Sequence, residues 1–204
     1  MIQIIILATF TVTVLAAVGA YVVAMRSIEI PPYSVVQTDG DIELRSYPEM
    51  TLAQVTRAGT RRHSVQAGFS PLARYIFAKD RTGEKIKMTA PVVQKPINDR
   101  WTVSFILPSH ITAEDAPKPS GEVTLMTQPV RLMATIRFSG IWSDRRFHEA
   151  ANRLERWIEV EGLRMQGPFE YGYYNDPFTP AFLRRNEVLV PVNGRSKGAF
   201  TEQS

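Results

Sequence analysis

The chain of 204 residues contains no cysteine. It can therefore form no disulfide, no thiolate metal site and no cysteine nucleophile. Signatures of common enzyme classes are missing too, namely Gly-x-Ser-x-Gly, His-Glu-x-x-His and the Walker phosphate loop. Glu170 and Glu84 are the best isolated carboxylates for activating water, but the sequence identifies no partner for either. We therefore expect a protein that is not an enzyme.

A strong charge of one sign is also absent. Lysine and arginine number 24 against 20 aspartates and glutamates, which gives a formal net charge of +4. This excess mildly favours anionic partners, but no basic run is longer than Arg61-Arg62 and no nucleic-acid fingerprint is present. We expect no binding to nucleic acid, and the sequence identifies no protein partner.

Charged side chains are missing altogether from residues 2–25. This segment is long enough to cross a hydrocarbon core of about 30 Å, and we expect residues 1–26 to form a transmembrane anchor. A cleaved secretory signal is the alternative, but basic residues ahead of its apolar run are lacking. We expect a single-pass membrane protein with its folded domain on the periplasmic or another extracytoplasmic side. Arg26 is the only basic residue close to the segment, so the positive-inside rule does not determine on which side of the membrane the domain lies.

Pro31-Pro32 breaks the apolar segment, and the mixed pattern that follows indicates one folded domain over residues 33–193. The last residues, 194–204, have the composition of a disordered tail. Alternating apolar and polar residues predict a hairpin turned at Asp39-Gly40 and a further strand. The predicted strands cover residues 33–37, 42–47 and 51–57.

Two amphipathic helices are expected. The first has Ser70 as N-cap and Pro71 at its first helical position. The second runs over residues 143–161 and ends at Gly162. Both helices stand in the same order of elements, namely strand, helix, strand, strand, which predicts a duplicated unit and a pseudo-two-fold barrel or curved sheet. The matched positions are Phe69 with Phe147, Ile76 with Leu154, and Pro91 with Pro177. A coincidence in an ordinary α+β domain is the alternative.

The stretch GEKIKMTAPVVQKP, residues 83–96, has the alternation of a half-buried strand. Ile86, Met88, Ala90 and Val92 point one way, and Lys85, Lys87 and Thr89 point the other way. In one interpretation the lysines are a solvated face, and Pro91 marks a bulge or a strand end. In the other interpretation, the lysines lie beside a groove and meet an acidic ligand.

The sequence resembles the SOUL haem-binding protein family. The resemblance lies in FSPLARYIFAKDRTGEKIKMTAPVV, residues 69–93, with support from SFILPS, RFSG and GPFEYGYYNDPFTPAFLRRNEVLVPV, and it covers roughly residues 33–192. Its most specific part is aromatic-x-x-Leu-x-x-Tyr-Ile followed by Lys-Ile-x-Met-Thr-x-Pro-Val. One departure is local, because Ala78 and Asp80 stand where the family tends to have a Gly-x-Asn turn.

This resemblance implies an α+β fold, namely a distorted, mostly antiparallel β-barrel built from two pseudo-two-fold repeats with two flanking helices. With the N-terminal transmembrane helix ahead of it, the barrel would form a membrane-anchored domain. The resemblance also implies non-catalytic binding of haem or another porphyrin in a cleft associated with the first helix. The fold is similar to bacterial effector-binding domains as well. A module for a small-molecule effector or for a protein, without iron ligation, is therefore the alternative function.

Haem has two carboxylates and a flat apolar body, so its site needs an apolar cleft with cations at the mouth. The resemblance directs the expected site to residues on or near the first helix. The expected binding residues are His63, Phe69, Leu72, Arg74, Tyr75, Ile76, Lys79, Lys85 and Lys87.

A haem site can also include an axial ligand to the iron, which is commonly His, Met, Cys or Tyr. His63, just ahead of the first helix, is the candidate metal ligand, and binding without any axial ligand is the alternative. His110 and His148 are expected on the surface, and Met88 in the core. An aromatic cluster of Phe169, Tyr171, Tyr173 and Tyr174 indicates either core packing or a wall for a flat ligand.

Overall fold

The structure is a computed structural model that describes residues 28–193. The predicted anchor over residues 1–26 and the predicted tail over residues 194–204 lie outside the described residues. Within residues 28–193, no helix is both long enough and apolar enough to cross a membrane. The described helices are α2 (Arg61–Ile76), α3 (Asp144–Val160) and the short 3-10 helix η1 (Ala181–Leu183).

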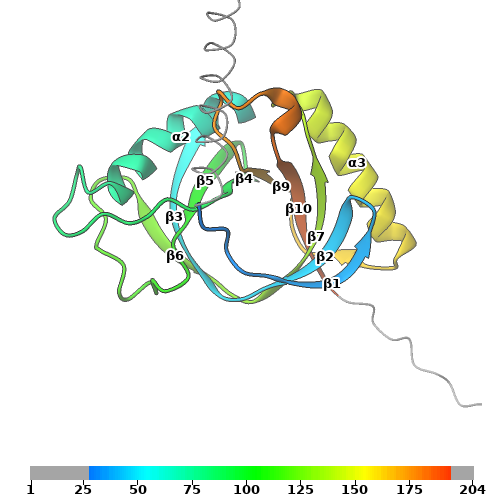
Figure 1. Cartoon of the computed structure of the whole chain (residues 1–204), viewed down its shortest axis with the longest axis horizontal. Helices are drawn as coiled ribbons and strands as arrows, with labels where there is room; N and C mark the ends of the chain where they lie inside the picture. The colour runs from blue at the N-terminus through cyan, green and yellow to red at the C-terminus, as the bar shows by residue number, and fades with distance from the viewer. Residues whose placement is uncertain (1–27, 194–204) are drawn as a thin grey trace, which may run out of the picture.

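Ten antiparallel strands form one strongly curved sheet (Figure 1). They are β1 (Ser34–Asp39), β2 (Ile42–Tyr47), β3 (Met50–Ala58), β4 (Val92–Ile97), β5 (Arg100–Ile106), β6 (Thr124–Gln128), β7 (Arg131–Phe138), β8 (Arg164–Met165), β9 (Glu170–Tyr173) and β10 (Asn186–Asn193). The order across the sheet is β1-β2-β7-β10-β9-β4-β5-β3-β6, with β8 paired to β10. The expected barrel is therefore an open sheet, because its end strands β1 and β6 do not pair with each other.

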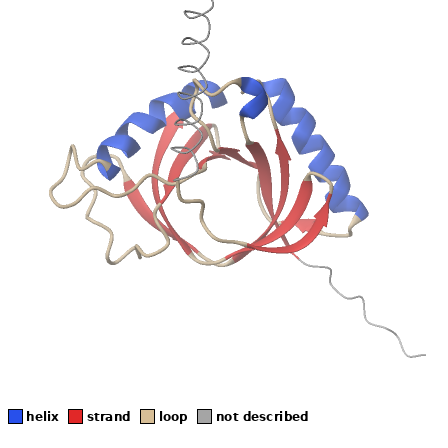
Figure 2. Cartoon of the chain, viewed as in Figure 1, coloured by secondary structure: helices blue, strands red, loops and turns tan. Residues whose placement is uncertain are grey.

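The sheet consists of two halves that repeat the same pairing pattern. In the first half, β3 pairs with β5 and β5 with β4. In the second half, β7 pairs with β10 and β10 with β9. The halves meet where β4 pairs with β9, with Val92 opposite Tyr173. This topology agrees with the duplicated order of elements, and it places one helix beside each half (Figure 2).

Alternation along the strands divides the apolar side chains between the two faces of the sheet. The larger cluster lies under the helices and includes Val55, Val103, Ile136 and Val190. A smaller cluster on the other face includes Met50, Leu52, Met133 and Leu189. Both helices pack on the convex side of the curved sheet (Figure 2). The core is therefore mainly a helix-to-sheet layer, which is the usual way for a one-sided sheet to bury its apolar face.

The first helix begins ten residues earlier than expected. Thr60, not Ser70, is its N-cap, and the Thr60 side chain accepts a hydrogen bond from the backbone N–H of His63. Pro71 lies inside the helix, where it lacks an N–H but is tolerated. The second helix starts after Ser143 as expected, and Gly162 follows its end with φ of +66°.

The stretch before Pro91 was expected to be a strand, and this expectation is wrong for residues 84–91. Apart from an isolated bridge between Thr89 and Glu29, this stretch pairs with no strand, and β4 starts only at Val92. Two isolated backbone hydrogen bonds hold it in place instead. The Ile86 N–H donates to the Ile76 carbonyl, and the Ala90 N–H donates to the Glu29 carbonyl. Thr89 is buried rather than on the lysine face, and its hydroxyl donates to the Ile106 carbonyl at 2.5 Å.

Two of the matched positions in the repeat are also wrong. Phe69 is 40% exposed whereas Phe147 is 1% exposed, so they do not fill equivalent places. Pro91 precedes β4, whereas Pro177 follows β9, the strand that corresponds to β4. Pro168, which lies two residues before β9, stands closer to the place that corresponds to Pro91.

Candidate functional site

Close packing fixes the position of α2 on the first half of the sheet. A Cβ atom added at Gly68 would lie 2.7 Å from Cγ2 of Val103 on β5, so only glycine allows this approach. Leu72, Tyr75 and Ile76 continue the buried side of the helix. The neighbouring helix face, which carries Val65, Gln66 and Phe69, is left turned toward the second half of the molecule.

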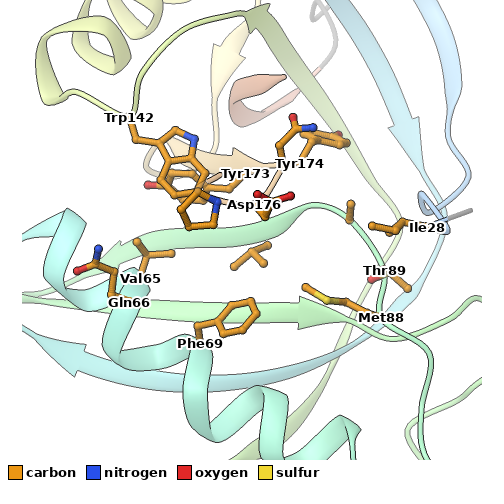
Figure 3. Close-up of a pocket in the computed structure, with 14 residues that line it drawn as sticks. Ile28, Val65, Gln66, Phe69, Met88, Thr89, Trp142, Tyr173, Tyr174 and Asp176 are labelled. Atoms are coloured by element: carbon orange, nitrogen blue, oxygen red, sulfur yellow. The ribbon is translucent and has the colours of Figure 1, made fainter. Parts of the chain in front are cut away.

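A cavity of about 420 Å³ opens beside this face of α2, at the seam between the two halves. Its volume lies within the range of roughly 300–1,000 Å³ that is usual for small-molecule sites. The wall opposite α2 comes from the loop before α3 and from the chain that follows β9. Figure 3 shows Phe69 on one side of the cavity with Trp142 and Tyr173 on the other. The lining residues are Ile28, Val65, Gln66, Phe69, Met88, Thr89, Ala90, Val92, Trp142, Tyr173, Tyr174, Asn175, Asp176 and Pro177.

Hydrogen bonds to the protein hold the aromatic side chains of the lining in place. The Trp142 Nε1–H donates to Asn186 Oδ1 at 2.8 Å. The Tyr173 hydroxyl donates to Gln94 Oε1 at 2.9 Å and accepts from Arg61 Nη1 at 2.5 Å. Burial raises the pKa of Tyr173 to about 12, although the nearby guanidinium of Arg61 opposes the shift. These rings therefore present fixed apolar surfaces to the cavity.

Tyr174 connects the cavity to a buried ionic network. Its hydroxyl donates to Glu187 Oε2 at 2.7 Å, and burial together with the charge of Glu187 raises its pKa well above the ordinary value. Glu187 is fully buried and accepts two hydrogen bonds from Arg45, at 3.0 and 3.1 Å. It also accepts from Arg185 at 2.7 Å. Burial alone would raise the pKa of Glu187, but the two guanidinium groups hold it below its ordinary value.

The expected site residues are distributed over several places. Phe69 lines the cavity. Leu72, Tyr75 and Ile76 are buried in the core beneath the helix. His63 is exposed on the first turn of α2 and does not line the cavity.

Arg74 lies on another face of α2, where it pairs with Asp80 at 2.6 Å. That face borders a second hollow of about 660 Å³, which also contains the ion pair between Arg57 and Glu122. Its walls include the charged side chains of Arg57, Arg74, Asp80 and Glu122, so it suits a flat apolar ligand less well than the cavity at the seam does. Tyr75 reaches this hollow as well, and its hydroxyl donates to the Pro117 carbonyl at 2.8 Å.

The expected cations follow α2 in the chain. Lys85 and Lys87 are exposed, and neither forms an ion pair with a residue of the described chain. Lys87 precedes Met88, a lining residue, so it lies nearest the cavity along the chain. Lys79 is part of the turn that follows α2, where its N–H bonds to the Arg74 carbonyl at 2.9 Å.

No histidine is among the lining residues of the cavity. Met88 is half-buried rather than sealed in the core, and its thioether side chain lies in the cavity wall (Figure 3). His110 and His148 are exposed, as expected. Within residues 28–193, no group of three histidine or acidic side chains is arranged to hold a metal ion.

The aromatic cluster of the second half divides between core and cavity. The ring of Tyr171 packs edge-on against Phe147 at 5.4 Å between centroids, outside the cavity. Tyr173 and Tyr174 line the cavity, and Phe169 packs against the core. Glu170 is paired with Arg131 through two hydrogen bonds, at 2.6 and 2.9 Å, so the isolated carboxylate expected from the sequence has a partner.

Sequence reasoning did not identify most of the cavity wall. Val65 and Gln66 were missed because the helix was expected to begin only at Pro71. The Gly59-Thr60 pair was the available signal, since threonine is a good N-cap and glycine often precedes a helix. Ile28, Trp142 and Pro177 gave no local signal, because only the fold brings these distant segments together.

The fold and the cavity define a class of protein in which two repeated sheet-and-helix units enclose an apolar pocket at their seam. Residues 28–191 match the family model of the SOUL heme-binding protein, and the chain belongs to this family. The chain is 27% identical over 179 residues to Heme-binding protein 2 of Mus musculus, covering 81% of this chain and 86% of the mouse protein.

Solved structures with the same fold have little sequence in common with the chain. The EcmrR C-terminal domain superposes with a TM-score of 0.60 at 16% identity, covering 80% of this chain and 99% of that domain. A protein described as a hydrolase from Listeria innocua has a TM-score of 0.53 at 17% identity, covering 78% and 94%. At these identities the likeness supports the fold alone.

Proposed function

We propose that the protein binds haem or a related tetrapyrrole, without catalysis, in the apolar cavity at the seam. The observation that carries the proposal is the cavity wall, in which aromatic rings from both halves face one another across the space. A porphyrin is a flat apolar body and gains most from contact with such surfaces. Membership of the SOUL family and the similarity to the mouse protein support this ligand class.

The ligand's carboxylates would be directed out of the cavity toward cations at the mouth. Lys87 is the best placed of the expected lysines, because it adjoins Met88 in the wall. Arg62 is a further candidate, because it is exposed and shares a helix face with Gln66 and Phe69 at spacings of four and seven residues. Charge-assisted bonds at these positions would orient the macrocycle rather than hold it.

Apolar contact, rather than iron ligation, would supply most of the affinity. The lining contains no histidine, and both tyrosine hydroxyls already have partners. The Met88 thioether is the remaining side chain of the wall that haem iron accepts. His63 would need to reach from the exposed first turn of α2.

Haemin and iron-free protoporphyrin provide the test. The full chain in lipid nanodiscs is titrated with each, with empty nanodiscs as the blank. We expect saturable binding of both, with affinities within about ten-fold of each other, because ligation would add more than about 1.4 kcal/mol for haemin alone. If haemin binds and iron-free protoporphyrin does not, iron ligation supplies most of the affinity, contrary to our expectation. Binding of neither would contradict the proposed function.

A module for a different small-molecule effector is the second candidate. The lack of histidine in the cavity wall favours it, because a site selected for iron would be expected to include a strong ligand. It predicts that neither porphyrin binds and that another flat apolar compound fills the same cavity.

We also propose that residues 1–26 anchor the protein in a membrane, with the folded domain on the extracytoplasmic side. The uncharged run over residues 2–25 supports the anchor. Protease protection of the full chain in sealed cells or vesicles would test the side.

A further inference from the structure

Large apolar side chains gather on the outside of the cavity mouth. Phe178 is 92% exposed, Phe182 is 77% exposed and Leu183 is 52% exposed, all on the loop that contains η1. Ile141, 55% exposed, precedes α3. The backbone N–H of Gly140 donates to the Ala181 carbonyl at 2.9 Å, which ties the two segments together. We refer to Ile141, Phe178, Phe182 and Leu183 as the apolar rim.

The loop that carries the rim is held in place by its own hydrogen bonds. The Asp176 carboxylate accepts from the N–H of Phe178 at 2.7 Å and from that of Thr179 at 3.0 Å. The Arg184 guanidinium donates to the carbonyls of Thr179 and Pro177, each at 2.7 Å. A loop built this firmly has a defined shape, so the outward position of its phenylalanines is a feature of the fold. Exposed apolar clusters of this kind mark interaction surfaces.

The cavity beside the rim is also lined by Ile28, the first residue that the structure describes after the uncharged segment. Ile28 lines the same cavity as Trp142 and Pro177, which are sequence neighbours of the rim residues Ile141 and Phe178. The uncharged run ends at Met25. Three peptide units, at most about 11 Å of extended chain, join Met25 to Ile28, so an anchor over residues 2–25 would hold this cavity near the bilayer.

The charges beside the rim suit an anionic lipid surface. Asp176 directs its carboxylate to backbone amides of its own loop. Arg146 is exposed on the first turn of α3, and Arg184 lies with its guanidinium 5.0 Å from the centroid of the Trp142 ring. Phenylalanine, leucine and isoleucine flanked by arginines form the composition of segments that lie in a bilayer interface.

We propose that the apolar rim docks into the interfacial layer of a lipid bilayer, so that the mouth of the cavity opens at the membrane surface. Phe178 and Phe182 enter the boundary between headgroups and acyl chains, and the exposed Arg146 faces the headgroups. This docking surface does not depend on what the cavity binds. A protein partner or a second copy of the chain on the rim is excluded by this proposal.

The lack of cysteine allows a direct test in the full chain. Phe182→Cys is labelled with an environment-sensitive fluorophore and reconstituted in vesicles of phosphatidylcholine and phosphatidylglycerol, with or without brominated acyl chains. Val160→Cys is the matched control, because Val160 is 80% exposed at the end of α3 far from η1 (Figure 1). We expect the label at 182 to lose roughly half its emission to the brominated lipid, and the label at 160 to lose none.

Leu183→Cys gives a second label on the rim, in case the label at 182 disturbs η1. Equal, low quenching at 160, 182 and 183 would overturn the proposal, as would a chain that does not float with the vesicles. An emission spectrum typical of an apolar environment at position 182, without quenching by brominated lipid, would also overturn the proposal. Protein, not lipid, would then cover the rim. Porphyrin titration of the same samples reports separately on the proposed function, so the two failures are distinguishable.

Discussion

Phe69 lies on α2 and Phe77 is the C-cap residue that follows it, and the two are equally exposed, at 40% and 39%. Only Phe69 lines the cavity at the seam, where its ring also packs edge-on against Phe105 at 5.2 Å between centroids. We expect Phe69→Ala to weaken porphyrin binding by roughly ten-fold, because an aromatic contact of about 1–1.5 kcal/mol is lost. Titration in nanodiscs measures this effect. Phe77→Ala is the matched control, and equal effects of the two substitutions would place the ligand elsewhere.

Lys87 tests whether cations at the mouth meet the ligand's carboxylates. Its removal should weaken haemin binding by about five-fold, since an exposed charge-assisted bond contributes near 1 kcal/mol. The stability of the fold should change by no more than about 0.5 kcal/mol. The affinity of the unaltered protein should fall as salt rises, because exposed charges are screened.

Lys85→Ala and Lys118→Ala provide graded controls for Lys87→Ala. Lys85 lies two residues farther from Met88 and should have a smaller effect, and Lys118, in a distant exposed loop, should have none. If all three variants and raised salt leave the affinity unchanged, the lysines are a solvated face only.

At the scale of the element, the N-cap of α2 can be tested by measuring stability. Thr60→Ala should lower the free energy of unfolding by about 1 kcal/mol, because it removes the N-cap acceptor for the His63 N–H. Ser70→Ala should be neutral or slightly stabilising, since Ser70 is in the helix interior and alanine is the better helix former. Urea unfolding of both variants measures the difference. A larger cost at Ser70 would support the shorter helix instead.

Local patterns predicted some elements well and others poorly, for identifiable reasons. The second helix has its cap at Ser143 and its glycine at 162, so its bounds followed from the sequence. The predicted start of the first helix was wrong because Pro71 is typical of a first helical position but here lies inside the helix. Alternation correctly placed Ile86 inside and Lys85 and Lys87 outside, but alternation cannot show whether a neighbouring strand is present to form a ladder.

At the scale of the whole molecule, the buried ionic network stabilises the second half of the sheet and supports the cavity wall. Glu187→Gln should lower the free energy of unfolding by about 3 kcal/mol at pH 7, because it removes the buried carboxylate shared by Arg45 and Arg185 and leaves Arg45 with Glu43 as its only carboxylate partner among the described residues. Glu159→Gln, at an exposed position on α3, should change it little. A small effect of Glu187→Gln would show that water replaces the lost carboxylate.

The same network predicts how stability depends on acid. The pKa of Glu187 is lower in the folded protein than its ordinary value of 4.5. As pH falls, the unfolded chain takes up this proton first, so the contribution is present above about pH 4.5 and is lost as pH falls through the lower, folded value. Urea unfolding at a series of pH values should therefore show a steeper acid loss for the unaltered protein than for Glu187→Gln. Parallel acid losses would contradict this assignment.

The duplicated order of elements could be predicted from the sequence, since it depends on local patterns and on the order of strand, helix, strand and strand. The open end of the sheet could not, because closure depends on whether β1 and β6 come within pairing distance. Of the residues expected to bind the ligand, only Phe69 lines the cavity, and Tyr173 and Tyr174 were indicated only as one of two alternatives for the aromatic cluster. Tertiary contacts between distant segments create such a site, and no single stretch encodes it.

The central claim is that the apolar cavity at the seam binds a tetrapyrrole, and a structure of the full chain with protoporphyrin tests it most directly. The account predicts a macrocycle between Phe69 on α2 and Trp142 on the opposite wall, with both carboxylates on the edge directed toward Lys87 or on the edge directed toward Arg62. A macrocycle in the polar hollow beside Arg74, or on the outer surface with the seam cavity empty, would contradict the account.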